Sequence, residues 1–124
     1  MRRLLLAIGL SVVLSGCLAT LSHYQLSHLN RGMAPADVAE KLKLPPLITV
    51  PVRTDGRSFE MERYLLNNGM GTDVYYLAYE NRRLLFWGYV SEFRRHPDPV
   101  LGRAVDAATA VPSPPPPNSA GQPK

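Results

Sequence analysis

Apolar residues recur with two different periods along the chain, and the change of period falls near residue 47. Across residues 18–29 the apolar positions follow a loose helical spacing, which predicts a short helix or a tether. A second helix is predicted for residues 35–44, where Pro35 suits the first turn and Val38 and Leu42 form an apolar stripe. Pro45 ends this helix, because the residue before a proline avoids the helical conformation.

Beyond residue 47 the pattern is that of β-strands. Several runs are rich in β-branched and aromatic residues, and turn residues such as Asp55 and Gly56 separate them. Pro51 has no amide proton to donate, so the first run is expected at the edge of a sheet. The predicted strands are residues 47–54, 58–66, 73–80 and 83–90.

The last two strands are predicted to form a hairpin around residues 81–82. A two-residue loop places Glu80 opposite Arg83, and this charged pair assigns its face of the hairpin to the outside. The same register places Tyr76 opposite Trp87 on that outer face. Exposed aromatic residues are typical of protein contacts, although another segment of the chain could cover them. The partner-binding residues of this hypothesis are Tyr76, Leu85, Trp87 and Tyr89, flanked by Val74.

The N-terminus has the pattern of an export signal. Arg2 and Arg3 precede an apolar run over residues 4–14. A run of this length is typical of a signal peptide and is shorter than the roughly 20 residues that span a bilayer. The segment is therefore predicted to direct export without itself crossing the membrane as a helix.

Residues 14–17 resemble the lipobox of bacterial lipoproteins, with Leu14, the small residues Ser15 and Gly16, and then Cys17. The resemblance implies that a signal peptidase recognises the first three residues and cleaves before Cys17. Cys17 would then carry a diacylglyceryl group and an N-acyl chain such as palmitate. The alternatives are an ordinary signal peptide with a chance cysteine, or an uncleaved anchor. Leu18 is not the aspartate associated with inner-membrane retention, which favours the periplasmic face of the outer membrane.

Composition narrows the function further. The formal charge of +4 falls to +2 once Arg2 and Arg3 are removed, and this balance does not indicate a nucleic-acid-binding protein. Cys17 is the single cysteine, so no disulfide can form within the chain. The mature segment is long enough for one small domain, which must be stabilised by its apolar core or by a partner.

The C-terminal part is expected to be weakly ordered. Residues 91–98 are polar, and residues 100–110 form at most a weak helix that nothing compels to dock. Residues 112–124 include four consecutive prolines and are predicted to be a disordered or polyproline II tail. The tail is interpreted as a solubilising terminus, or else as a ligand for a proline-recognising partner or a cell-wall spacer. The predicted organisation is signal peptide 1–16, lipid anchor and tether or first helix 17–28, domain 29–98, and weakly ordered tail 99–124.

Several short motifs resemble the SmpA/OmlA (BamE-like) family of small outer-membrane lipoproteins. They are residues 32–38, which begin with a Gly-Met pair and lead into the second predicted helix, residues 42–45 at the end of that helix, an aromatic strand with Tyr64, and the hairpin at 79–84. The resemblance covers about residues 29–90. It implies an α+β fold with two short helices packed on one face of a three- to four-stranded antiparallel sheet, similar to half of a β-lactamase-inhibitor-protein architecture.

The departures from the family pattern concern helix ends, the turn and one strand. Lys43 and Arg82 replace the usual glycines, Ala34 is a poor helix cap, Tyr79 replaces a phenylalanine, and Glu62 occupies the place of a tryptophan. The family would also turn Tyr64 inward, whereas alternation places Phe59, Met61 and Leu65 on the opposite face of that strand.

No constellation of residues points to catalysis. The histidines have no cysteine or carboxylate cluster to complete a metal site, and Glu60 and Glu62 are interpreted as a solvated charged stripe. We therefore expect no enzyme activity, no metal, no cofactor and no small-molecule substrate. The sequence predicts a lipid-anchored scaffold or accessory factor in outer-membrane protein assembly or envelope integrity. The alternative is an inhibitor or binding module that captures an envelope enzyme or a cell-wall ligand.

Overall fold

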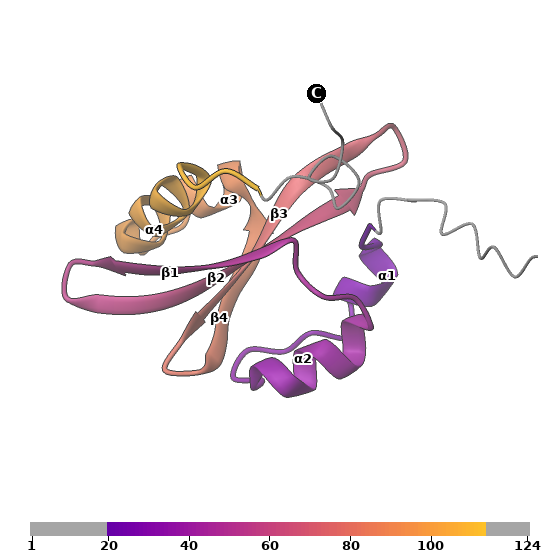
Figure 1. The fold of residues 1–124 in the computed structure, drawn as a ribbon, viewed down its shortest axis with the longest axis horizontal. Coiled ribbons are helices and arrows are strands. Elements are labelled where there is room, and N and C mark those ends of the chain that lie inside the picture. Colours follow the sequence, from indigo (N-terminus) through magenta and orange to yellow (C-terminus); the bar gives the residue numbers. More distant parts are fainter. Residues whose placement is uncertain (1–19, 114–124) are drawn as a thin grey trace, which may run out of the picture.

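The computed structural model describes residues 20–113, which form an α+β domain around a four-stranded antiparallel sheet (Figure 1). The strands follow one another in the order β1-β2-β3-β4, so each pairs with its neighbour in the sequence. This confirms the predicted α+β class and the antiparallel sheet. The strands are β1 (Ile48–Thr54), β2 (Arg57–Asn67), β3 (Thr72–Glu80) and β4 (Arg83–Tyr89).

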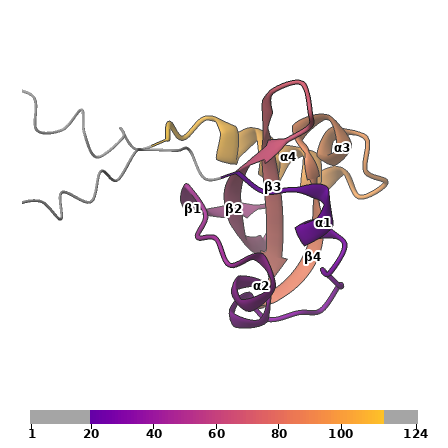
Figure 2. The same cartoon turned by 90° about the vertical axis from the view of Figure 1, so that its right-hand side faces the viewer.

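Helices cover both faces of this sheet (Figures 1 and 2). The pair α1 (His23–Leu26) and α2 (Pro35–Leu42) lies on one face, and the pair α3 (Val90–Arg94) and α4 (Pro99–Thr109) lies on the other. No helix in residues 20–113 is both long enough and apolar enough to cross a membrane.

Two hydrophobic cores result, one on each side of the sheet. The first core lies under α1 and α2 and comprises Leu21, Leu26, Leu29, Val38, Leu42, Tyr64, Leu66, Tyr75, Leu77, Tyr79 and Leu84. The second core lies under α3 and α4 and comprises Val50, Val52, Phe59, Met61, Tyr76, Ala78, Phe93, Leu101, Ala104, Val105 and Ala108. Because both faces of the sheet are covered, five consecutive residues of β3 are buried, instead of every second residue.

The double cover resolves the conflict over β2. Tyr64 packs into the first core, while Phe59 and Met61 pack into the second. The pairings of β2 with β1 and β3 run without a register shift, so no bulge is needed to turn Tyr64 toward the helices. The side chains of β2 therefore alternate as predicted and Tyr64 is also buried, because helices cover both faces of the strand.

The expectation that the chain after residue 98 is weakly ordered was wrong for α4. Asp98 caps this helix, with its Oδ1 accepting a hydrogen bond from the amide of Val100 at 3.0 Å, and Pro99 occupies the first turn. Its buried side chains recur at helical spacing and complete the second core. The polar stretch after β4 was also mispredicted, since residues 90–94 form α3 and bury Phe93.

The predicted hairpin between β3 and β4 has the expected loop and a different register. Asn81 and Arg82 both have positive φ, and Glu80 lies opposite Arg83 as predicted. A β-bulge then intervenes: Tyr79 pairs with Leu84 and Ala78 pairs with Phe86, which leaves Leu85 as the extra residue. From the bulge onward every pair differs by one residue from the predicted register.

The remaining predicted elements agree with the structure apart from their ends. Helix α2 begins at Pro35 and ends at Leu42, and Lys43 closes it in the left-handed conformation that a glycine would adopt more readily. Helix α1 is a single turn, shorter than expected, and Ser22 caps it. The side-chain amide of Gln25 in α1 donates from Nε2 to the carbonyl of Leu42 at 2.6 Å, which ties the two helices together.

Candidate protein-interaction site

Strand β3 extends beyond the end of β4, and this leaves part of its edge open. The last β4 pair joins Tyr75 to Tyr89, after which the chain turns into α3. The first three residues of β3 are held on their other side by β2, where Val74 lies opposite Leu65. Within residues 20–113 no strand pairs with this part of β3 on the β4 side. Unpaired strand edges of this kind are templates for another extended chain.

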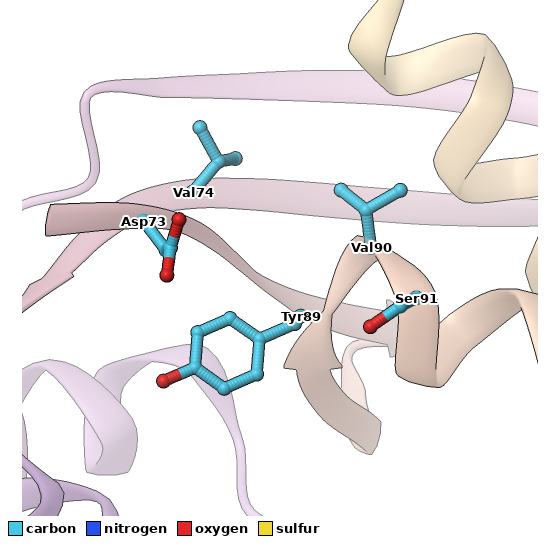
Figure 3. A pocket seen from close by; sticks show the side chains of 5 residues that line it. All are labelled: Asp73, Val74, Tyr89, Val90 and Ser91. Carbon is cyan, nitrogen blue, oxygen red and sulfur yellow. The ribbon is translucent and has the colours of Figure 1, made fainter. Parts of the chain in front are cut away.

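A surface hollow of about 490 Å³ lies at this open edge (Figure 3). We call it the β3-edge hollow, and it is lined by Asp73, Val74, Tyr89, Val90 and Ser91. The side chain of Val74 is 38% exposed, while Tyr89 and Val90 are half-buried. Figure 3 shows the valine side chains on one side of the β3 ribbon and the Tyr89 ring on the other, so the hollow wraps around the strand edge.

The chain reversal at Tyr89 depends on a glycine and a carboxylate. The amide of Tyr89 donates to Oε1 of Glu92 at 2.9 Å, which satisfies a free donor at the start of α3. A Cβ on Gly88 would lie 3.1 Å from both Cβ and Oε1 of Glu92. Glycine therefore leaves room for the carboxylate that ends β4 and opens the edge of β3.

The Tyr89 ring is positioned by an aromatic neighbour. It lies edge-on to Tyr75, with ring centroids 5.2 Å apart and an interplanar angle of 82°. Burial, together with the nearby Glu92 carboxylate, raises the pKa of the Tyr75 hydroxyl. The Tyr75 hydroxyl therefore remains uncharged at neutral pH, and its ring supports the Tyr89 ring that lines the hollow.

A second hollow, of about 320 Å³, adjoins the first and shares Val74 and Val90 with it. Its remaining lining residues are Arg63, Tyr76, Thr109, Val111, Pro112 and Ser113. The segment that follows α4 thus forms one wall, and the end of β3 forms the other. The two hollows meet at the shared valines, which are the apolar part of a surface that also carries polar groups.

The chemistry of the combined surface suits binding of a chain segment. It offers valine and tyrosine side chains for apolar contact, an open strand edge for main-chain hydrogen bonds, and the Asp73 carboxylate as a polar group at the rim. No group of three or more histidine, cysteine, aspartate or glutamate side chains in residues 20–113 is placed to hold a metal ion.

The aromatic patch predicted from the sequence is divided between the two faces of the sheet. Tyr76 is fully buried in the second core, where Arg63 and Phe93 contact it, and the prediction that it lies exposed beside Trp87 was wrong. Leu85 packs against the second core, while Trp87 and Tyr89 pack against the first. Of the four predicted residues only Tyr89 lines the β3-edge hollow, together with the flanking Val74.

The bulge explains this difference, because Leu85 and Phe86 both pack against the second core and every later residue of β4 changes face. Sequence reasoning also missed Val90 and Ser91. A signal for them was available: Glu92 stands three residues after Tyr89, the spacing at which a side chain caps a helix start. That spacing predicts that β4 ends at Tyr89.

The half-buried Glu62 lies on the same face of the sheet as Tyr64 and the first core. Burial raises the pKa of Glu62, and the Tyr64 hydroxyl donates to its Oε1 at 3.4 Å. The Tyr79 hydroxyl is buried and has no hydrogen-bond partner within residues 20–113. Glu62 and Tyr64 border a hollow of about 260 Å³ whose other walls include Pro35, Pro45 and Pro46. Glu62 is thus less solvated than the charged stripe predicted from the sequence.

The predicted lipid-attachment residue Cys17 and the recognition residues Leu14, Ser15 and Gly16 lie outside the described residues. The described chain begins just after them, and Leu21 is held by β2: its amide donates to the carbonyl of Leu65 at 2.8 Å. Comparison with protein-family models, with curated proteins and with solved structures found no match for the chain.

Proposed function

We propose that this chain is a non-enzymatic, lipid-anchored envelope protein that binds a protein partner through the β3-edge hollow. In this proposal it acts as a scaffold or accessory factor in outer-membrane protein assembly or envelope integrity. The observation that carries the binding role is the open edge of β3 beside the exposed Val74 and the Tyr89 ring.

The anchor part of the proposal rests on the sequence of residues 14–17 and on the reach of the chain. Three residues separate Cys17 from Leu21, which β2 holds in place. The four residue steps from Cys17 to Leu21 span at most about 14 Å at full extension. A lipid on Cys17 would therefore keep the domain close to the membrane surface, and two or more acyl chains make such anchoring stable.

The binding part rests on the match between the hollow and an extended polypeptide. Such a segment can add main-chain hydrogen bonds along the open edge of β3 while its side chains contact Val74 and Tyr89. Contacts of this kind involve few residues, and aromatic side chains contribute strongly to them. A periplasmic loop or an unfolded strand of an outer-membrane protein has this chemistry.

Affinity purification from gently solubilised membranes tests the proposal. Val74→Asp places a charge on the exposed valine of the hollow, and we expect it to reduce recovery of the partner about tenfold or more. Leu47→Asp is the matched control, because Leu47 is 37% exposed and Val74 is 38% exposed, and Leu47 lines neither hollow. The control should recover the partner as the original chain does.

Components of the barrel-assembly machinery among the recovered proteins would support the scaffold role. Recovery of a single envelope hydrolase would instead support the alternative, an inhibitor or capture module. Equal recovery with Val74→Asp and Leu47→Asp would contradict the assignment of the hollow as the contact. Membrane fractionation of Cys17→Ser tests the anchor separately, since unchanged membrane association would contradict lipidation.

A further inference from the structure

The starting point is a buried arginine that fixes the segment after α4. Arg63 in β2 is only 5% exposed, and its guanidinium donates to the carbonyl of Ala108 at 2.7 Å and to the hydroxyl of Ser113 at 2.8 Å. It also donates to the carbonyl of Val111. These bonds close the C-terminal end of α4 and hold Ser113 against the sheet.

The held segment is the root of the proline-rich tail. Four prolines, residues 114–117, directly follow Ser113 in the sequence and lie outside the described residues. Pro112 and Ser113 themselves line the second hollow, opposite Val74 and Val90. The tail therefore starts at the wall of the second hollow, which shares Val74 and Val90 with the β3-edge hollow.

We propose that residues 114–117 pack across Val74 and Val90 as a polyproline II segment and cover the β3-edge hollow. The segment then competes with the partner for the same surface, so this inference rests on the proposed function. The chain carries its own occupant for the site and releases the site when a partner displaces the tail.

The chemistry and reach of the segment fit this surface. Proline fixes its own φ, so a run of prolines is extended before it binds and loses little conformational entropy on docking. Four such residues span about 12 Å in polyproline II form. Proline-rich segments bind shallow grooves with apolar side chains, and Val74 and Val90 provide such side chains in the hollow that Pro112 and Ser113 line. Attachment at Ser113 also makes the contact intramolecular, with an effective concentration on the order of millimolar.

Hydrogen exchange of the full chain in detergent micelles tests the proposal without any partner. In the original chain we expect the amides of Asp73, Val74 and Ser91 to exchange about tenfold more slowly than in a chain that ends at Ser113. A chain that ends at Pro117 is the matched control, because it keeps the four prolines and loses residues 118–124. This control should retain the protection.

A second variant separates the prolines from mere chain length. Substitution of residues 114–117 by serine keeps the tail at full length and should lose the protection, as the chain ending at Ser113 does. Equal exchange at Asp73, Val74 and Ser91 in all chains would overturn the proposal. A loss of protection spread evenly over β1 and β2 would overturn it as well, because it would indicate general destabilisation. Neither result depends on recovery of a partner. The exchange experiment can therefore contradict the tail proposal without contradicting the proposed function, and the affinity purification can contradict the proposed function without contradicting the tail proposal.

Discussion

The guanidinium of Arg63 donates from Nε to the hydroxyl of Tyr76 at 2.8 Å, and this bond joins β2 to β3 beneath α4. The arginine is buried, yet its four hydrogen-bond partners within residues 20–113 are hydroxyl and carbonyl oxygens. Burying a charge is costly unless its donors are satisfied. Arg63 meets that condition by binding carbonyls at the C-terminal end of α4, where the helix dipole favours a positive charge.

Arg63→Met should therefore lower the stability of the domain substantially. Methionine keeps much of the apolar volume but leaves the Tyr76 hydroxyl and the carbonyls at the end of α4 without their donor. Hydrogen bonds to charged groups contribute about 1.5–3 kcal/mol, and we expect a loss of about that size in the free energy of unfolding from urea denaturation. Arg53→Met is the control, because Arg53 lies exposed on β1. Similar losses in both variants would contradict the role of Arg63.

The strands could be predicted from sequence because their composition and turn residues are local signals. Pro51 lies on β1, which is an edge strand as predicted, and Asp55 and Gly56 form the turn that follows. For the second face of the hairpin the sequence left two alternatives open, an exposed patch or cover by another segment of the chain. The structure shows the second alternative, because α4 packs over Tyr76 and Ala78. The sequence did not predict that residues 100–110 dock there, because the pattern of that segment alone does not show which surface it covers.

The candidate site was harder to predict than the fold. The β-bulge depends on how β3 and β4 pack between two layers of helices. No single residue type in either strand predicts it. The hollow arises because β4 ends at Tyr89 while β3 continues past its last pair with β4. Its prediction therefore requires the exact ends of both strands, which the sequence pattern does not fix. Tyr89 and Val74 were named from sequence, while Val90 and Ser91 were assigned to a strand end and a polar stretch.

The hairpin turn offers a stabilising substitution. Arg82 adopts φ of 59°, a left-handed conformation that is unfavourable for a residue with a Cβ and natural for glycine. Arg82→Gly should raise the free energy of unfolding by about 0.5–1 kcal/mol, visible as a higher thermal midpoint. Arg95→Gly is the control, since Arg95 has φ of −94° and glycine there relieves no strain. A lower midpoint for Arg82→Gly would mean that the turn is not limited by this conformation.

Asp98 has two roles that substitution can separate. One carboxylate oxygen caps α4, and the other accepts a hydrogen bond from Arg57 at 2.7 Å. Asp98→Asn keeps a capping oxygen and loses the ion pair, whereas Asp98→Ala loses both. We expect Asp98→Ala to be the less stable of the two by about 0.5–2 kcal/mol in urea denaturation, the usual contribution of a cap. Equal stabilities would show that the cap contributes nothing.

The same ion pair predicts a loss of stability in acid. Arg57 also donates to Glu80, and it lowers the pKa of the carboxyls of Glu80 and Asp98. A carboxyl whose pKa is lowered by folding stabilises the folded state above its unfolded pKa, and this contribution disappears as the pH falls through the folded value. Thermal midpoints should therefore fall less steeply below pH 4 in Arg57→Met than in the original chain. Parallel pH profiles would contradict this prediction.

Glu62 should act in the opposite direction, because burial raises its pKa in the folded protein. An acid with a raised pKa binds a proton more readily when folded, so its contribution to stability falls as the pH rises from the unfolded pKa, about 4.3, through the folded value. Glu62→Gln removes this cost and still offers an oxygen to the Tyr64 hydroxyl. Thermal midpoints at pH 7 should be higher for Glu62→Gln than for the original chain, with a smaller difference at pH 4. Glu40→Gln is the control on the exposed surface of α2. A lower midpoint for Glu62→Gln at pH 7 would mean that the ionised carboxylate stabilises this face of the sheet.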